Sequence, residues 1–299
     1  MKPAVLLWIA LIALPIMEVA LHFRARAAVP AQSDWQRAAE LVRSELEPKD
    51  LIVSAPGWTD PLLRAVLGDR IGPAMAGRSD LAGFERLWSL SIRGALPAEA
   101  GSRAPALRKV FGGVTVERYE LGPSSVRSDL VDRIASAEVS LGSRPCPHKR
   151  LPLARGGGLG YGVLPPIERF QCDGAGTWLA EVVLEDLSIT PRRCVFQPPG
   201  VGSPTRVLLR GVELSDQLVF YGGLYYEHER MRQGEPVVAT VLANGTPIGT
   251  LTHRDGDGWK KLALKTQPGT VDLAIEVRSA SRKQRGFCWA ASVRKEQAR

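Results

Sequence analysis

The sequence is poor in the residues from which active sites are usually assembled. It has only four histidines and four cysteines in 299 residues, and it contains neither a GxSxG segment nor a CxxC pair. Cys146 and His148 are close in sequence, but they do not have the spacing of a structural zinc site. We therefore expect no catalytic residue, no metal and no cofactor. Enzymatic activity stays undecided, with a non-catalytic role favoured.

Long runs of basic residues are also absent. Lys and Arg exceed Asp and Glu by 39 to 31, which gives a formal net charge of +8. The densest basic cluster, residues 282–285, is too short to indicate a nucleic-acid site. The sequence therefore predicts a dispersed basic surface and no nucleic-acid partner.

Two short segments could suggest a bound ligand. Residues 155–162 are rich in glycine, but a dinucleotide site needs a strand before such a segment and a helix after it. Prolines flank this segment at Pro152 and Pro165, so we predict a flexible loop. Residues 253–259 contain two aspartates but lack the further acidic ligands of a calcium loop, so we predict a hairpin turn.

Residues 4–23 form a long apolar run with one charge, Glu18. About twenty apolar residues in a helix span the ~30 Å hydrocarbon core of a bilayer. We predict a transmembrane anchor or signal segment within residues 1–29, retained rather than cleaved. Cleavage near Ala25-Arg26-Ala27 is the alternative. The rest of the chain is then expected to be extracytoplasmic, in the periplasm or at the cell surface.

The four cysteines fit an exported protein, because an even number without metal spacing indicates disulfides. We predict two bonds, Cys146 with Cys172 and Cys194 with Cys288.

Residues 33–138 are expected to form a small parallel α/β layer, which is Rossmann-like. Ser33 resembles an N-cap with Gln36 as its capping-box partner, followed by a helix that ends before Pro48. Residues 51–55, 86–92 and 114–121 read as strands, and residues 81–84, 104–110 and 128–138 read as helical.

Residues 139–299 change in character. Short apolar or alternating segments recur between Gly, Pro and Asp, as in an antiparallel β-sandwich or jelly roll. The pair Asn244-Gly245 is a strong hairpin signal, because both turn positions need a positive φ. The expected strands are 167–172, 177–187, 193–196, 206–214, 217–221, 236–243, 247–253, 260–265, 270–278 and 286–293.

Aromatic residues at strand ends and in loops are the strongest candidates for a binding site. Sugar rings stack on the flat apolar faces of Trp and Tyr, whose polar tips can form hydrogen bonds. Packing in the core or at its rim is the alternative for each residue. The candidates for sugar stacking are Trp58, Trp178, Tyr225, Tyr226 and Trp259.

The apolar segment is followed by SDWQRAAE at residues 33–40 and DLIVSAP at residues 50–56. With residues 86–88 and 116–119, this order resembles the last transmembrane helix and periplasmic α/β tail of polytopic glycosyltransferases that use lipid-linked sugars. The resemblance covers residues 4–121. The catalytic loop and the other helices of that family have no counterpart here, so no catalytic residue is transferred. Residues 193–196, 258–259 and 287–289 resemble galactose-binding-like jelly-roll modules.

Together these features favour a membrane-anchored, extracytoplasmic, non-catalytic accessory or binding module. Its expected partners are the membrane, through residues 4–23, and an envelope polysaccharide or a membrane glycosyltransferase. A structural envelope protein or a split-gene remnant of a glycosyltransferase is the alternative. A glycan-active enzyme with a site between its two domains is the third hypothesis.

Overall fold

The computed structural model describes residues 3–27, 29–152, 163–172 and 177–296. The glycine-rich segment 155–162 lies outside the described residues. The chain divides into two compact units. Unit 1 comprises residues 1–72 and 84–123, and unit 2 comprises residues 73–83 and 124–299.

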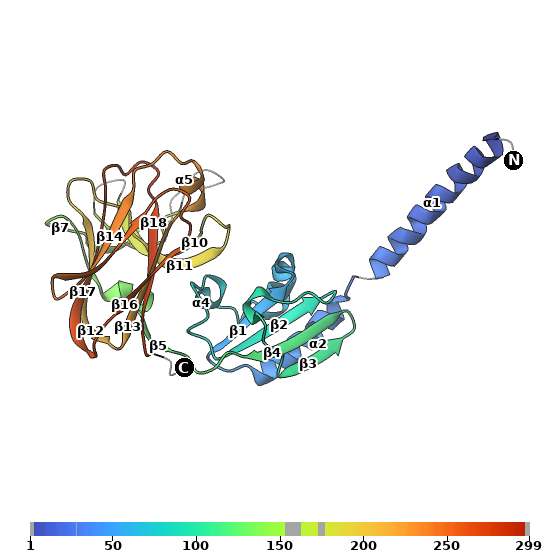
Figure 1. The fold of residues 1–299 in the computed structure, drawn as a ribbon, viewed down its shortest axis with the longest axis horizontal. Helices are drawn as coiled ribbons and strands as arrows, with labels where there is room; N and C mark the ends of the chain where they lie inside the picture. Colours follow the sequence, from blue (N-terminus) through green and yellow to red (C-terminus); the bar gives the residue numbers. More distant parts are fainter. Residues whose placement is uncertain (1–2, 28, 153–162, 173–176, 297–299) are drawn as a thin grey trace. The chain divides into compact units, whose positions relative to one another are not determined.

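Unit 1 begins with two helices and continues as an α/β layer (Figure 1). Its elements are α1 (Pro3–Ala27), α2 (Gln32–Glu45), β1 (Asp50–Ala55), η1 (Gly57–Thr59), α3 (Asp60–Leu67), β2 (Arg86–Ile92), η2 (Ala98–Ala100), β3 (Leu107–Phe111) and β4 (Val114–Glu120).

The membrane span expected for residues 4–23 is not confirmed: α1 is helical, but within the described residues no helix is both long and apolar enough to cross a bilayer.

The sheet of unit 1 is mixed, not parallel as expected. Its strand order is β1-β2-β4-β3, and only the β1–β2 pair is parallel. Residues 104–110 were expected to be helical, but most of them form β3, which pairs with β4 across the turn at Gly112-Gly113. A two-residue Gly-Gly connection favours a hairpin, because glycine readily adopts positive φ. Residues 81–84 are not helical either.

Helix α2 starts two residues earlier than expected, with Ala31 as its N-cap. Ser33 is not its N-cap, because the backbone N–H of Ala31 is bound by the carboxylate of Asp34, with an N–Oδ2 distance of 3.2 Å. The same carboxylate oxygen accepts the N–H of Gly113 at 3.1 Å, and Arg37 binds the other oxygen. These donors hold the pKa of Asp34 below its usual value. Asp34 thus joins the start of α2 to the β3–β4 turn.

A buried ionic cluster organises the start of β1. Asp50 is 1% exposed and accepts hydrogen bonds from Arg86 Nε and Nη2 at 2.7 and 2.6 Å. Trp88 Nε1 donates to Asp50 at 2.8 Å, and the N–H of Glu47 donates at 2.9 Å. The carboxylate is therefore fully paired. Removing it would leave the buried indole N–H of Trp88 without a partner and would leave Arg86 with only Glu47 and the carbonyl of Glu45.

We expect Asp50→Ala to destabilise unit 1 by about 3 kcal/mol, because charge-assisted hydrogen bonds to Arg86 are lost and the buried indole N–H of Trp88 is left unsatisfied. Hydrogen exchange of the β1 and β2 amides would measure the loss of protection. Asp69→Ala, which removes an exposed carboxylate paired with Arg43, is the control and should leave those amides protected. Equal protection in Asp50→Ala and the wild type would contradict this account.

Unit 2 is a β-sandwich with short helices. Its elements are α4 (Pro73–Ala76), β5 (Val126–Asp129), η3 (Val131–Ser136), β6 (Glu138–Leu141), β7 (Arg144–Pro145), β8 (His148–Arg150), β9 (Glu168–Gln171), β10 (Trp178–Glu185), β11 (Pro191–Phe196), β12 (Thr205–Leu214), β13 (Gln217–Leu224), α5 (Tyr226–Arg230), β14 (Val237–Ala243), β15 (Thr246–His253), β16 (Lys260–Lys265), β17 (Gly269–Ser279) and β18 (Phe287–Arg294).

Two sheets enclose the core of unit 2 (Figure 1). In the described residues, one sheet has eight strands in the order β16-β13-β18-β11-β10-β9-β8, with β5 paired to β18. The other has six strands in the order β15-β14-β17-β12-β6-β7. The ten strands expected after residue 139 correspond to β9 to β18. The antiparallel β-sandwich predicted from the sequence is therefore confirmed.

Two local predictions in unit 2 had opposite outcomes. Asn244 and Gly245 form the turn between β14 and β15 with φ of 49° and 81°, which confirms the hairpin. The helix expected over residues 128–138 is wrong, because this segment ends β5, forms η3 and begins β6. Pairing of β5 with β18 and of β6 with β12 overrides the local helical preference.

Both predicted disulfides are present. Cys146 is bonded to Cys172, and Cys194 is bonded to Cys288. Cys288 is fully buried, in a strand that is buried throughout its length. Such bonds are typical of an oxidising, extracytoplasmic compartment.

The two disulfides should differ in their effect on stability, because they close loops of different length. Their sequence separations are 94 residues for Cys194–Cys288 and 26 for Cys146–Cys172. Chain entropy predicts a loss of about 5 kcal/mol for the double Cys→Ser variant of the long loop and about 3.5 kcal/mol for that of the short loop. Urea unfolding of the sandwich measures both. A larger loss for the short loop would contradict this ordering.

Candidate functional site

The outer face of the eight-stranded sheet carries most of the predicted binding residues. Val195 pairs with Trp289, whose indole faces the other sheet, so alternate residues point outward. Phe196 pairs with Cys288 and with Ala180, and these three residues share the outer face. Trp178, two residues before Ala180, lies on the same face.

Five aromatic rings on this face form a connected group, which we call the aromatic cluster. Trp178 stacks on Phe196 with ring centroids 4.4 Å apart. Tyr225 meets the edge of Tyr226 at 5.0 Å and of His228 at 5.4 Å. The two groups adjoin at Gly286, where a Cβ atom would lie 2.9 Å from His228 Nδ1 and 3.1 Å from Phe196 Cε2. Three of the five predicted residues are thus brought together.

The imidazole of His228 has a defined tautomer. The N–H of Gly286 donates to His228 Nδ1 at 3.1 Å, so Nδ1 carries a lone pair and Nε2 carries the proton. Burial lowers the pKa of His228, which keeps the ring neutral. The cluster therefore presents an N–H donor among its aromatic faces.

A buried carboxylate holds helix α5, which carries Tyr226 and His228. Glu229 Oε1 accepts the N–H groups of Gly256 and Gly258 at 3.1 and 2.6 Å, so α5 is joined to the loop that follows β15. Burial raises the pKa of Glu229. His253 Nε2 donates to the carbonyl of Gly258 at 2.8 Å, and burial lowers the pKa of His253. The loop of residues 253–259 is thus a braced turn, and its described residues contain no metal-binding group of side chains.

Trp259 lies in a different aromatic contact. Its ring is parallel to that of Tyr221 at 6.4 Å, and the guanidinium of Arg192 lies 5.8 Å from its centroid. A Cβ atom at Gly223 would be 2.7 Å from Trp259 Cε3, so the indole packs closely on β13. The ring of Trp259 is therefore packed against Tyr221, Arg192 and Gly223, which is the packing role given above as the alternative to sugar stacking.

Trp58 belongs to unit 1 and has no part in the aromatic cluster. It lies in η1, directly after β1, and is 64% exposed. Its role as a stacking residue stays a prediction.

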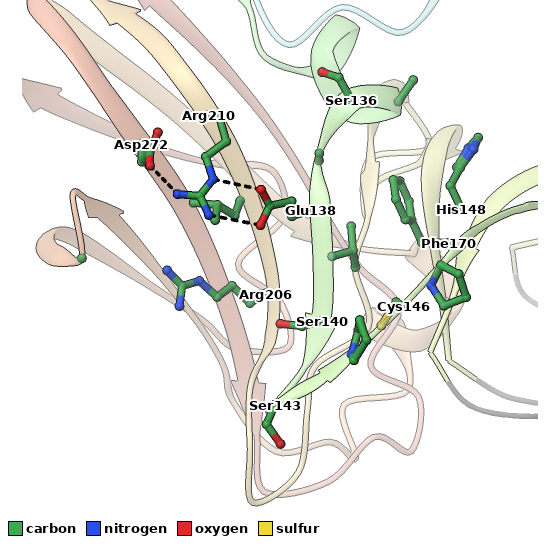
Figure 2. A pocket seen from close by; sticks show the side chains of 18 of the residues that line it. Ser136, Glu138, Ser140, Ser143, Cys146, His148, Phe170, Arg206, Arg210 and Asp272 are labelled. Carbon is green, nitrogen blue, oxygen red and sulfur yellow. Dashed lines mark hydrogen bonds and ion pairs between the residues drawn. The ribbon is translucent and has the colours of Figure 1, made fainter.

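A pocket of about 1100 Å³ opens on the outer side of the six-stranded sheet (Figure 2). It is bordered by β12, the β6–β7 hairpin, Phe170 and the Asn244-Gly245 turn. Arg210 crosses one side of it. This guanidinium donates to Glu138 at 2.9 and 3.2 Å and to Asp272 at 2.5 Å. Arg210 lowers the pKa of both carboxylates.

Sequence reasoning missed several residues of both regions. Phe196 and His228 join the aromatic cluster through contacts with residues distant in sequence, and Arg206 lines the pocket. A signal was available for Arg206 and Arg210, because they alternate with apolar residues of a predicted strand and so occupy its outer face. No comparable signal marks His228.

No protein-family model and no curated protein matches the chain. Solved structures show partial likeness. The CBM51-2 and INT domains of ZmpB from Clostridium perfringens, in complex with GlcNAc, share 13% identity and a TM-score of 0.35, over 62% of this chain and 35% of that chain. The CBM51 of GH95 from Clostridium perfringens, in complex with methyl-galactose, shares 10% identity and a TM-score of 0.29, over 38% of this chain and 81% of that chain.

The tandem CBM51 modules of Sp3GH98, a family 98 glycoside hydrolase from Streptococcus pneumoniae, share 10% identity and a TM-score of 0.32, over 67% of this chain and 61% of that chain. The alignment spans 35% of the length of that GlcNAc complex and 25% of a further structure of the CBM51-2 and INT domains of ZmpB. The C-terminal β-sandwich resembles carbohydrate-binding modules. With TM-scores of 0.29 to 0.35 and identities of 10 to 13%, this likeness carries no argument about function. No match supports the resemblance to glycosyltransferases.

Stability of unit 2 should fall as the pH drops below 6.5, because His228 and His253 have lowered pKa values. Below 6.5 the unfolded chain binds protons that the folded chain excludes, and the loss is at most about 1.4 kcal/mol per pH unit for each histidine. Urea unfolding at several values between about pH 5 and about pH 7.5 measures how the free energy of unfolding changes with pH.

His253→Phe removes one of the two contributions and should flatten this slope. His148→Gln, at an exposed position, is the control. Glu229 gives a slope of opposite sign above pH 4.5, so the comparison is made between variants at equal pH. An unchanged slope in His253→Phe would show that the histidine is not responsible.

Proposed function

We propose that unit 2 is a non-catalytic carbohydrate-binding module and that the aromatic cluster is its binding surface. One observation supports this most directly. Trp178, Tyr225 and Tyr226 were selected from the sequence for sugar stacking. Trp178 stacks on Phe196, Tyr225 contacts Tyr226 and His228, and Phe196 and His228 both lie next to Gly286. Trp178 lies in β10, Phe196 in β11, and the other three at the start of α5 or within it, so their meeting depends on the fold and not on closeness in sequence.

The cluster combines the two kinds of group that a sugar needs. Its half-buried Trp and Tyr rings offer apolar faces for the C–H side of a pyranose. His228 Nε2 offers an N–H donor, and Tyr226 Oη, which donates to Glu227 Oε1 at 3.1 Å, offers an acceptor for a hydroxyl. The guanidinium of Arg230, 5.8 Å from the Tyr226 ring, adds further donors at the margin.

The setting proposed for this module is the cell envelope. The two disulfides favour an oxidising compartment, and envelope polysaccharides are the carbohydrates found there. Action alongside a membrane glycosyltransferase is the finer form of the proposal, and its support is the sequence resemblance of residues 4–121.

Trp178→Ala and Tyr226→Ala should each weaken glycan binding by about 10- to 30-fold, because truncating a central aromatic anchor costs about 2 kcal/mol. The purified full chain is applied to an array of envelope glycans, and the affinity for the glycan retained best is then measured by calorimetry. Thermal melting confirms that each variant is folded.

Trp58→Ala is the matched tryptophan variant in unit 1, and we expect its affinity to equal that of the wild type. Loss of binding in Trp58→Ala alone would assign the site to unit 1 and refute the proposal. Retention of no glycan by the wild-type chain would refute the aromatic cluster as a carbohydrate-binding surface.

A further inference from the structure

The pocket beside β12 lies on the opposite sheet from the aromatic cluster. Arg206 and Leu208 of β12 face it, and their neighbours Val207 and Leu209 belong to the core. Ser140 of β6 is the direct strand partner of Arg206. Paired residues of β12 and β6 therefore form one wall of the pocket, next to the β6–β7 hairpin at the edge of the sheet.

Arg206 and Arg210 differ in how their charge is used. Figure 2 shows Arg210 tied by dashed lines to Glu138 and Asp272, and no such line reaches Arg206. Among the described residues, the buried Nε of Arg206 has no hydrogen-bond partner, and Glu276 lies 3.8 Å from it. The side chain of Arg206 is 38% exposed. Arg206 is thus ion-paired with Glu276 through its buried Nε, and the donors that a ligand can reach are those of its Nη groups.

The other lining groups suit a small polar molecule that has one flat apolar side. Ser140, Ser143 and Asn244 supply hydroxyl and amide groups. The paired rings of His148 and Phe170, 4.8 Å apart, and the side chain of Leu208 supply apolar surface. A volume of about 1100 Å³ is sufficient for one or two sugar rings.

We propose that this pocket binds an acidic sugar, a uronic acid residue, with Arg206 as the anchor for its carboxylate and Ser140 as a neighbouring hydrogen-bond group. The planar guanidinium matches a carboxylate in a two-pronged contact. Because Glu138 and Asp272 are already bound to Arg210, they do not compete for Arg206. The choice of a sugar rests on the proposed function, but the site is separate from the aromatic cluster.

The test titrates the full chain with glucuronic acid, glucose and acetate by saturation-transfer NMR. We expect glucuronic acid to bind more tightly than either glucose or acetate. Arg206→Gln should weaken glucuronic acid binding by about tenfold or more, because charge-assisted hydrogen bonds are lost. Arg206→Lys keeps the positive charge but loses the planar guanidinium, so its affinity for glucuronic acid should lie between those of the wild type and Arg206→Gln.

Arg127→Gln removes an exposed arginine of β5 outside the pocket and should bind glucuronic acid as the wild type does. Equal binding by Arg206→Gln and the wild type would overturn the proposal, as would binding of acetate as strong as that of glucuronic acid. Thermal melting shows whether each variant is folded.

The two proposals can fail separately. Trp178→Ala should leave glucuronic acid binding unchanged, since Trp178 does not line the pocket. If the glycan array is negative but Arg206-dependent binding of glucuronic acid is found, the aromatic cluster is not the site and the pocket proposal stands. If neutral glycans bind at the cluster but glucuronic acid does not bind, only the pocket proposal falls.

Discussion

Gln197 connects the two sheets of the β-sandwich through hydrogen bonds in the middle of the core. Its side chain is fully buried, and Oε1 accepts the indole N–H of Trp289 at 2.7 Å. Nε2 donates to the carbonyls of Thr205 and Ile275 at 3.0 and 3.2 Å, which belong to the opposite sheet. A buried amide is costly unless all its groups are paired, so this link fixes one alignment of the sheets.

The two candidate sites both depend on that alignment. Phe196, one residue before Gln197, points to the outer face of the eight-stranded sheet and supports Trp178. Arg206, one residue after Thr205, points to the outer face of the six-stranded sheet and lines the pocket. Because side chains alternate along a strand, a one-residue shift of β11 would turn Phe196 into the core, and a one-residue shift of β12 would do the same to Arg206. The polar link in the core and the polar groups outside are therefore parts of one pattern.

The amount of the fold that could be predicted follows the range of the interactions involved. The strands after residue 139 and the Asn244-Gly245 turn were predictable, because alternation and turn residues are local signals. The pairing of β5 with β18 was not, because it joins residues more than 150 positions apart and overrides a helical pattern. The β3–β4 hairpin was a missed local signal, since Gly112-Gly113 lies between two strand segments.

The same distinction applies to the sites. Residue type selected Trp178, Tyr225 and Tyr226, but only the fold shows that Trp178 meets the other two through Phe196 and His228. Likewise, the sequence alone gives no reason to expect that Arg210, and not Arg206, forms the ion pairs with Glu138 and Asp272. The separation arises from geometry, since Glu138 and Asp272 converge on Arg210, whereas Arg206 has the more distant Glu276 beside it and an Nε without a hydrogen bond.

The disulfide between Cys194 and Cys288 affects how firmly the aromatic cluster is held. It joins β11 to β18 on the outer face, directly beside Phe196 and the strand that starts next to Gly286. A covalent link there prevents the two strands from sliding, so the rings above them are ordered before a ligand arrives. Ordering in advance reduces the entropy lost on binding. A preordered surface suits ligands that bind with low affinity, such as sugars, because little binding energy is available to rearrange the protein.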